Sequence, residues 1–271
     1  MGEPDLPSAP GGQPVRRWRL VVAYDGSGFR GFAAQVGAAV PTVAGALAEA
    51  IARTARLDGP PPIVCAGRTD AGVHALGQVV HVDLPDTFGR DLAHAVNRQL
   101  APAVVVRSAE PAPPGFDARR AARARHYRYL VWNAPSPHPL LAAATWHVAA
   151  PLDLRSMAAA ADVLIGEHDF RSFCRRAPGT AASQLIVRRV TEARWSGAAD
   201  PDMEGGRVLR FDVSAGSFCH QMVRSIVGAL VEAGRGRANA ATVVALLASG
   251  SRAGAPRPAP PQGLCLVSVT Y

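Results

Sequence analysis

The stretch that decides the fold is Cys65-Ala-Gly-Arg-Thr-Asp-Ala-Gly-Val-His-Ala-Leu-Gly77. The apolar residues at 63–66 predict a strand that enters a loop, and those at 77–83 predict the strand that leaves it. The glycines between them allow tight turns and the close approach of another molecule. One acid, Asp70, stands in the middle of this loop.

Asp70 has two interpretations. A carboxylate on a loop held between two strands is in a usual position for a catalytic group, with Arg68 and Thr69 to hold or screen it. Alternatively, Asp70 caps a turn by accepting hydrogen bonds from backbone N–H groups. The residues alone leave both interpretations open.

Outward from this loop, the hydrophobic pattern predicts the order β-α-β-β-α-β in each half of the chain. The first half has predicted strands at 18–24, 63–66, 77–83 and 104–108, and predicted helices at 42–57 and 90–100. The second has predicted strands at 125–132, 185–195, 207–213 and 264–271, and predicted helices at 153–165, 217–233 and, as an extra element, 239–248. Thr42 and Asp153 are the expected N-caps of their helices.

This order is that of the ferredoxin-like unit. We therefore expect an α+β protein of two lobes, with antiparallel-rich sheets, helices on one side of each sheet, and a ligand cleft between the lobes. The Pro-rich segment Glu110-Pro-Ala-Pro-Pro-Gly115 marks a boundary. The predicted parts are a disordered tail at 1–15, a first lobe at 16–115 and a second lobe at 116–271.

The composition points to a globular protein with an anionic partner. The chain has 271 residues, a net charge of +8 and 29 basic residues, all of them Arg. Coding bias explains the absence of Lys, and Arg also suits phosphate contacts, so the two explanations are compatible. No apolar run reaches the ~18–20 residues of a membrane span. The four cysteines lie far apart without a CxxC pair, so we expect a soluble, cytoplasmic protein with reduced thiols and neither a zinc site nor a disulfide framework.

Two arginine clusters follow the boundary. Residues 116–129 contain Arg119, Arg120, Arg123, Arg125 and Arg128 beside two tyrosines. On a strand, Tyr127 and Tyr129 share one face and His126 and Arg128 share the other. Arginines beside aromatic rings suit a nucleic-acid surface, whereas the alternative is a solvated strand edge. The second cluster is Arg171, Arg175 and Arg176.

The predicted helix at 217–233 carries one arginine apart from its apolar stripe. Arg224 lies roughly 130° from the centre of that stripe at 100° per residue. In a cleft, this guanidinium would pair with Asp70 and keep it ionised. The alternative is an ordinary surface arginine.

Several common sites are excluded. Gly26-Ser-Gly28-Phe-Arg-Gly31 matches GxGxxG after a strand, but the next helix begins about ten residues too late to bind a dinucleotide. The histidines form no metal-binding pattern, and the chain has neither a GxSxG motif nor a P-loop.

Beyond residue 16 the sequence resembles the bacterial tRNA pseudouridine synthase A family. The resemblance rests on Tyr24–Gly31, on Gly67-Arg-Thr-Asp-Ala-Gly-Val-His-Ala75, on Phe116–Arg119 with Tyr127-Arg-Tyr129, on Gly166–Phe170, on His220-Gln-Met-Val-Arg224 and on Pro260–Leu264. It departs from the family at Gly31-Phe32-Ala33, where Gly-Trp-Gln is usual, at His126, where a basic residue is frequent, and over residues 175–183.

The resemblance implies a homodimeric isomerase that converts uridine to pseudouridine at nucleotides 38–40 of the tRNA anticodon stem-loop, without metal or organic cofactor. It implies that Asp70 is the catalytic aspartate, Tyr127 the active-site tyrosine and Arg224 the partner of the aspartate. The residues expected to contact RNA are Arg68, Thr69, His74, Arg119, Arg125, Tyr129, Arg171, Arg175 and Arg176.

Two other function classes are weighed against this one. A catalytically silent RNA-binding protein or chaperone of the same fold is disfavoured because Asp70, Tyr127 and Arg224 are all present. A glycosidase or nucleoside hydrolase usually needs two working carboxylates, and no second acid falls in a catalytic motif. Release of free uracil would distinguish the hydrolase.

Overall fold

The computed structural model describes residues 14–33, 40–86, 91–176, 179, 181, 184–199 and 205–271. Most of the predicted tail lies outside the described residues. The chain divides into two compact units. The first unit comprises the described residues up to Ala122 together with Tyr271, and the second comprises Arg123–Thr270. The division falls shortly after the Pro-rich segment.

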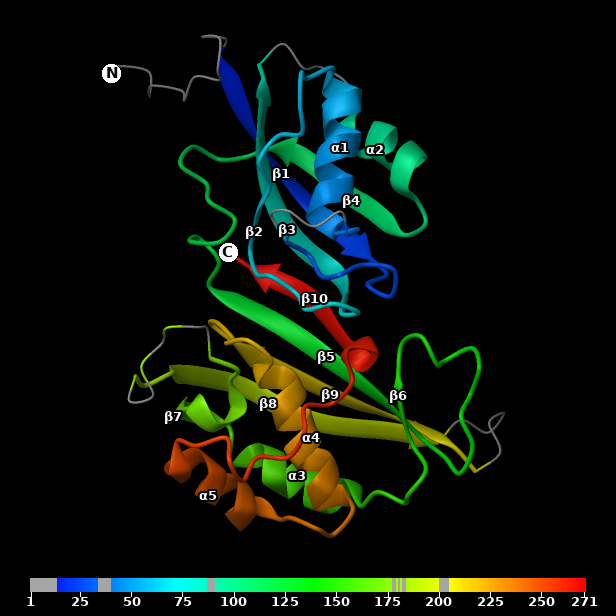
Figure 1. Ribbon diagram of the computed structural model, residues 1–271, viewed down its shortest axis with the longest axis vertical. Helices are drawn as coiled ribbons and strands as arrows, with labels where there is room; N and C mark the ends of the chain where they lie inside the picture. Colours follow the sequence, from blue (N-terminus) through cyan, green and yellow to red (C-terminus); the bar gives the residue numbers. More distant parts are fainter. Residues whose placement is uncertain are drawn as a thin grey trace. The chain divides into compact units, whose positions relative to one another are not determined.

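The first unit has four strands and two helices among its described residues. In chain order they are β1 (Val15–Tyr24), α1 (Val43–Ala55), β2 (Val64–Cys65), β3 (His74–Pro85), α2 (Leu92–Leu100) and β4 (Val104–Pro111). The antiparallel sheet runs β4-β1-β3-β2 (Figure 1). The last strand therefore lies beside the first, and the second beside the third, as in the ferredoxin-like unit.

One face of this sheet forms the first core. Leu20 and Val22 of β1 are fully buried, as are Leu47 and Ile51 on the inner stripe of α1. Alternating burial on β1 and a helical repeat on α1 are the two periods that bury one side of each element. Thr42 caps α1 by accepting from Gly45 N–H, as predicted.

The second unit carries the same arrangement with additions. Its elements are β5 (Ala124–Asn133), β6 (Trp146–Val148), α3 (Leu154–Asp162), β7 (Gly166–Asp169), the 3₁₀ turn η1 (Arg171–Phe173), β8 (Val187–Ala199), β9 (Arg207–Ala215), α4 (Met222–Gly234), α5 (Ala240–Ser249), the 3₁₀ turn η2 (Pro261–Gly263) and β10 (Leu264–Thr270). The sheet runs β10-β5-β9-β8-β7, antiparallel throughout, with β6 parallel to the end of β5. The order β10-β5-β9-β8 repeats β4-β1-β3-β2.

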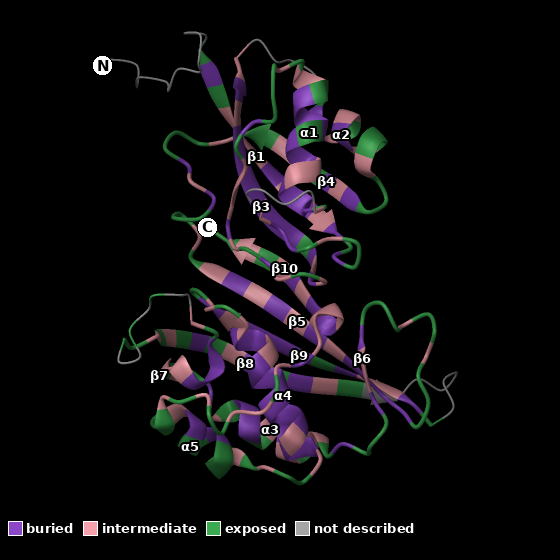
Figure 2. Cartoon of the chain, viewed as in Figure 1, coloured by how far each residue is buried: buried purple, intermediate pink, exposed green. Residues whose placement is uncertain are grey.

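Strand β5 shows how the second core is built. Its residues alternate between buried and half-buried along most of its length (Figure 2). The buried set includes Tyr127 and Tyr129, and the neighbouring β9 buries Phe211 and Val213. α3 packs against α4 and β8, and the helices lie on one side of this sheet (Figure 1).

The predicted α+β class and the repeated strand-helix order are confirmed. The sequence analysis missed β6 and β7, because strands of three and four residues are too short to show an alternation. β1 also begins at Val15 rather than at residue 18, because Val15 pairs with Pro85 on β3.

The helix predicted from residue 217 begins instead at Met222. Gln221 precedes it in the left-handed conformation, with φ 63°, and ends the non-helical segment that contains Cys219. Cys219 forms a disulfide with Cys174, 45 residues away. The expectation of reduced thiols throughout is therefore wrong for this pair, because the fold brings together two cysteines that are distant in sequence. Cys65 and Cys265 are free thiols.

Within the described ranges, no helix has the length and hydropathy needed to cross a bilayer.

Candidate active site

The Asp70 loop joins β2 to β3 in the first unit. Two hydrogen bonds fix the start of this loop. Ala66 N–H donates to Val79 O at 2.8 Å, and the Gln78 side-chain amide donates to Gly67 O at 2.6 Å. A backbone bond from Val73 N–H to Asp70 O, at 3.2 Å, closes the turn itself. The turn is therefore held by hydrogen bonds that do not involve the Asp70 carboxylate, and Asp70 itself is half-buried.

The glycine-rich turn after β1 packs directly on this loop. Phe32 N–H donates to Thr69 O at 3.1 Å, and Gly72 N–H donates to Phe29 O at 3.4 Å. A Cβ on Gly26 would lie 2.1 Å from Val73 O. Gly26 and Gly31 of the GxGxxG motif thus pack against the Asp70 loop, which accounts for these two glycines without a nucleotide.

Two residues expected to contact RNA are engaged inside this loop. Thr69 is buried, and its hydroxyl lies 2.8 Å from the hydroxyl of Tyr24. His74 Nδ1 accepts from Gly26 N–H at 3.1 Å and lies equally far from Asp25 Oδ1. Both side chains position the loop, and their contact with RNA stays a prediction.

Arg68 and Arg119 are exposed residues of the same unit. Arg119 follows a tight turn in which its backbone N–H donates to Asp117 Oδ1 at 2.8 Å. The adjacent Ala118 N–H donates to His81 Nδ1 at 3.0 Å. Burial lowers the pKa of His81, which keeps the ring neutral and able to accept this bond. The segment that carries Arg119 is therefore anchored to β3.

The two predicted tyrosines lie on β5 in the second unit. The Tyr127 ring packs edge-on against Phe218, with 5.1 Å between ring centres. Tyr129 is fully buried, and its hydroxyl donates to Pro260 O at 2.7 Å. Burial raises the pKa of the Tyr129 phenol. Tyr129 is thus a core residue, so its predicted contact with RNA is disfavoured by its position.

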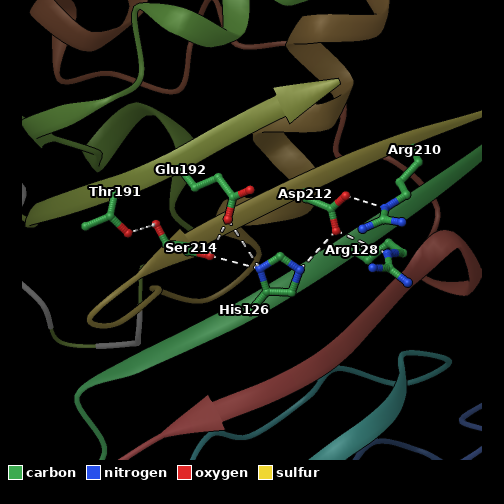
Figure 3. Close-up of polar contacts among 7 residues, drawn as sticks. All are labelled: His126, Arg128, Thr191, Glu192, Arg210, Asp212 and Ser214. Atoms are coloured by element: carbon green, nitrogen blue, oxygen red, sulfur yellow. Dashed lines mark hydrogen bonds and ion pairs between the residues drawn. The ribbon is translucent and has the colours of Figure 1, made fainter. Parts of the chain in front are cut away.

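The opposite face of β5 carries a charged network, drawn in Figure 3. His126 lies between Asp212, at 2.9 Å from its Nε2, and Ser214, at 2.9 Å from its Nδ1. Arg128 and Arg210 also bind Asp212. Burial raises the pKa of Asp212, but hydrogen bonds from Arg210 and Arg128 outweigh it and hold the pKa below its usual range.

This network changes the interpretation of the first arginine cluster. Arg128 is committed to a buried carboxylate, and the buried Arg125 donates to Gly216 O. Neither is a solvated edge residue. Arg125 fixes the segment that leads into α4, and its contact with RNA stays a prediction.

Arg224 stands on the first turn of α4 and is half-buried. Its Nε donates to Ala259 O at 2.7 Å, and Ala259 N–H donates back to Arg224 O at 2.9 Å. Arg224 also lines a cavity of about 940 Å³, and the described residues that line this cavity all belong to the second unit. Five more arginines line the same cavity: Arg171, Arg175, Arg176, Arg252 and Arg257.

The structure thus brings Arg224 together with the predicted cluster at 171–176. It adds Arg252 and Arg257, which the sequence analysis did not single out. Both lie in a segment rich in Gly and Pro without periodicity, so only the fold shows that they share a cavity with α4. Among the described residues, no group of three or more His, Cys, Asp or Glu is arranged to hold a metal ion.

Comparison with known sequences bears on both units. The sequence profile described as tRNA pseudouridine synthase matches residues 20–119 and 160–271. These segments hold the Asp70 loop and every arginine of the cavity. The chain belongs to the tRNA pseudouridine synthase family.

Individual relatives extend the match over nearly the whole chain. A protein of Frankia casuarinae named tRNA pseudouridine synthase A is 44% identical over 257 residues, which cover 94% of this chain and 89% of that protein. Proteins of the same name from a Methylobacterium species and from Cutibacterium acnes are 45% identical over 262 residues and 40% identical over 259 residues. These cover 94% and 95% of this chain, and 97% and 89% of the relatives.

Pseudouridine synthases are isomerases, so membership makes this chain an enzyme of that class. Asp70 lies in the first unit, whereas Tyr127 and Arg224 lie in the second. The pairing of Asp70 with Arg224 stays a prediction.

Proposed function

We propose that the protein converts uridine to pseudouridine at nucleotides 38–40 of the tRNA anticodon stem-loop, with Asp70 as the catalytic carboxylate. The observation that carries this proposal is the Asp70 loop. Its backbone is fixed on both sides by hydrogen bonds from β3 and from the glycine-rich turn, so the carboxylate has a defined position. A pre-positioned group of this kind is what catalysis at one atom of a flipped nucleotide requires.

The reaction replaces one bond to C1′ with another and transfers one proton in net terms. The bond between N1 of uracil and C1′ of the ribose breaks, the base rotates, and a bond forms between C5 and C1′. The proton on C5 is then lost, and N1 gains one. In the proposed mechanism the Asp70 carboxylate acts at the sugar, either as a nucleophile on C1′ or as a base that removes the 2′ proton.

Tyr127 and Arg224 have separate roles in this proposal. Tyr127 stacks on the extruded uracil, and its hydroxyl assists removal of the C5 proton. The edge-on contact with Phe218 supports this role, because it fixes the ring plane. Arg224 keeps Asp70 ionised by pairing with it.

The remaining parts of the proposal concern partners. Arg68, Arg171, Arg175 and Arg176 contact the RNA backbone. The enzyme acts as a homodimer in the cytoplasm and needs neither a metal ion nor an organic cofactor. Light scattering from the purified protein tests the dimer.

The experiment that tests the function is tritium release from tRNA labelled at uridine C5. Pseudouridine formation must expel that hydrogen. We expect release by the wild type, none by Asp70→Asn, and tRNA affinity within several-fold of wild type in that variant. Asp58→Asn is the matched control, because Asp58 is an exposed acid of the same unit. A fully active Asp70→Asn protein would overturn the proposed mechanism.

A further inference from the structure

Two polar side chains occupy buried positions on the core face of the first sheet. On β3 the residues Gln78, Val80 and Val82 alternate along one face, and none of the three has exposed surface. On β1 the buried set ends at Tyr24, which is 4% exposed. Val22 of β1 lies opposite Gln78, so the two polar residues share this face. A polar group is costly there unless it forms a hydrogen bond.

The amide of Gln78 is spent on one bond to the Asp70 loop. Its Nε2 donates to Gly67 O at 2.6 Å, three residues before Asp70. Its Oε1 is buried and has no hydrogen-bond partner among the described residues. A core amide with one unsatisfied end is unfavourable for stability. The bond to Gly67 is therefore what accounts for an amide at a position where β3 otherwise continues with valines.

The hydroxyl of Tyr24 reaches the residue directly before Asp70. It lies 2.8 Å from Thr69 Oγ1, and the Tyr24 ring packs at a tilt against Phe32, with 6.0 Å between ring centres. Phe32 N–H donates in turn to Thr69 O at 3.1 Å. Thr69 is buried and Asp70 is half-buried, so a rotation of Thr69 out of the core would turn the Asp70 carboxylate as well.

The strand that carries Tyr24 is a firm base for this contact. β1 lies between β3 and β4 (Figure 1), and Tyr24 is paired with Ala75 on one side and with Val104 on the other. The next residue, Asp25, donates its N–H to Ala103 O at 3.0 Å. The hydroxyl is thus fixed to the centre of the sheet, and it fixes Thr69 in the same place.

We propose that Tyr24 and Gln78 are positioning residues for the reaction. Each holds one end of the segment from Gly67 to Thr69, and together they set the direction of the Asp70 carboxylate without contacting the nucleotide. This inference rests on the proposed function of Asp70. It gives Thr69 the role of a link between Tyr24 and Asp70, which differs from the RNA contact expected from the family resemblance. Support of this kind matters because a reacting group must be held to within a fraction of an ångström.

The first test removes one polar group at a time and measures turnover and binding separately. Tyr24→Phe keeps the ring and removes the hydroxyl, and Gln78→Met keeps the length of the side chain and removes the amide. Each should lower the kcat of tritium release about tenfold, whereas the affinity for tRNA should change less than about twofold. Thermal unfolding sets an assay temperature at which every variant is folded.

A double-mutant cycle tests whether Tyr24 acts through Thr69. Thr69→Val removes the hydroxyl with little change of shape and should lower kcat as Tyr24→Phe does. In the Thr69→Val background, Tyr24→Phe should cause no further loss of kcat, because the bond is already absent. Thr69→Ser keeps the hydroxyl and should retain kcat to within about threefold. Losses that simply multiply would overturn the link.

The matched control is Tyr271→Phe, which removes the same group from a tyrosine of the same unit whose hydroxyl donates to Ala118 O. Its kcat should equal that of the wild type. An active wild type with unchanged kcat in Tyr24→Phe and Gln78→Met would overturn the positioning role. So would a weaker affinity for tRNA with kcat intact, which would make these residues part of the RNA contact. Absence of tritium release by the wild type would instead overturn the proposed function.

Discussion

The first unit carries its candidate catalytic group on a hairpin loop, whereas the second carries its arginines around a cavity, although the two units share one strand order. In the first, Asp70 lies between β2 and β3, two strands of the repeated unit itself. In the second, most of the cavity residues lie on or beside η1 and α5, elements that the first unit does not have among its described residues. The repeated scaffold supplies the carboxylate, and the additions supply most of the residues that line the cavity.

A cross-strand pair sharpens the comparison. Arg17 of β1 is paired in register with Asp83 of β3, and Arg128 of β5 is paired in register with Asp212 of β9. These strands occupy equivalent places in the two sheets. The first pair is about one-third exposed, whereas Asp212 is 4% exposed and contacts Arg128, Arg210 and His126. The pair in the second unit, Arg128 and Asp212, is thus part of a buried network, whereas the equivalent pair in the first unit is partly exposed.

The largest effect that we expect concerns the disulfide, which belongs to the second unit alone. It closes a loop of 45 residues, and the chain-entropy estimate for such a loop is ~4 kcal/mol. Reduction should lower the stability of the second unit by this order and leave the first unchanged. Trp18 is the one tryptophan before residue 122, so in a Trp18→Phe background the fluorescence reports the second unit. Denaturant unfolding with and without dithiothreitol measures the change, and an unchanged midpoint would contradict it.

The next effect separates the two units by function. In Gly26→Ala the new Cβ would lie 2.1 Å from Val73 O, a backbone atom that cannot move without displacing the Asp70 loop. We expect kcat to fall about 100-fold, since a displacement of about 1 Å costs that much. The affinity for tRNA should change less than threefold. Gly28→Ala is the control, because a Cβ there meets nothing within 4 Å.

The corresponding glycine substitution in the second unit is Gly228→Ala. Gly228→Ala pushes the new Cβ against Arg257 O, in the segment that holds Arg224 through Ala259, and should weaken tRNA binding and lower kcat together. Gly254→Ala is its control, since only Leu246 Cδ2, at 3.9 Å, is near. If Gly228→Ala left both kcat and tRNA affinity unchanged, the segment from Arg257 to Ala259 would have no part in the site.

Local patterns predicted the repeated elements, because each depends on near neighbours in sequence. These patterns predicted the Thr42 and Asp153 caps and the apolar stripe of α1, and all three are confirmed. The cavity could not be predicted from the sequence. Arg252 and Arg257 lie near α4 only because the segment after α5 folds back towards that helix. The pairing of Cys174 with Cys219 and the burial of Tyr129 also depend on contacts between distant segments. The resemblance to a family pointed to Asp70 and Arg224, but not to the way in which their supports are built.

The smallest effects that we expect concern the stability contributed by the two Arg–Asp pairs. Asp83→Asn should cost under about 1 kcal/mol, as is usual for a partly exposed pair. Asp212→Asn should cost about 2 kcal/mol, because it leaves two guanidinium groups and His126 without a buried anion. Urea unfolding at pH 7 measures both. Equal costs would mean that the added neighbours of Asp212 do not strengthen the pair.

The pH dependence of the free energy of unfolding tests the same comparison in a second way. A hydrogen bond from Arg17 lowers the pKa of Asp83, and the guanidinium groups around Asp212 lower its pKa against the effect of burial. A carboxyl with a lowered pKa in the folded state stabilises the protein above its unfolded pKa, ~3.9, and loses this contribution as the pH falls through the folded value. The difference between wild type and Asp212→Asn should therefore shrink as the pH is lowered from 5 towards acid. A difference that stayed constant over this range would show that the charge of Asp212 is not what stabilises the second unit.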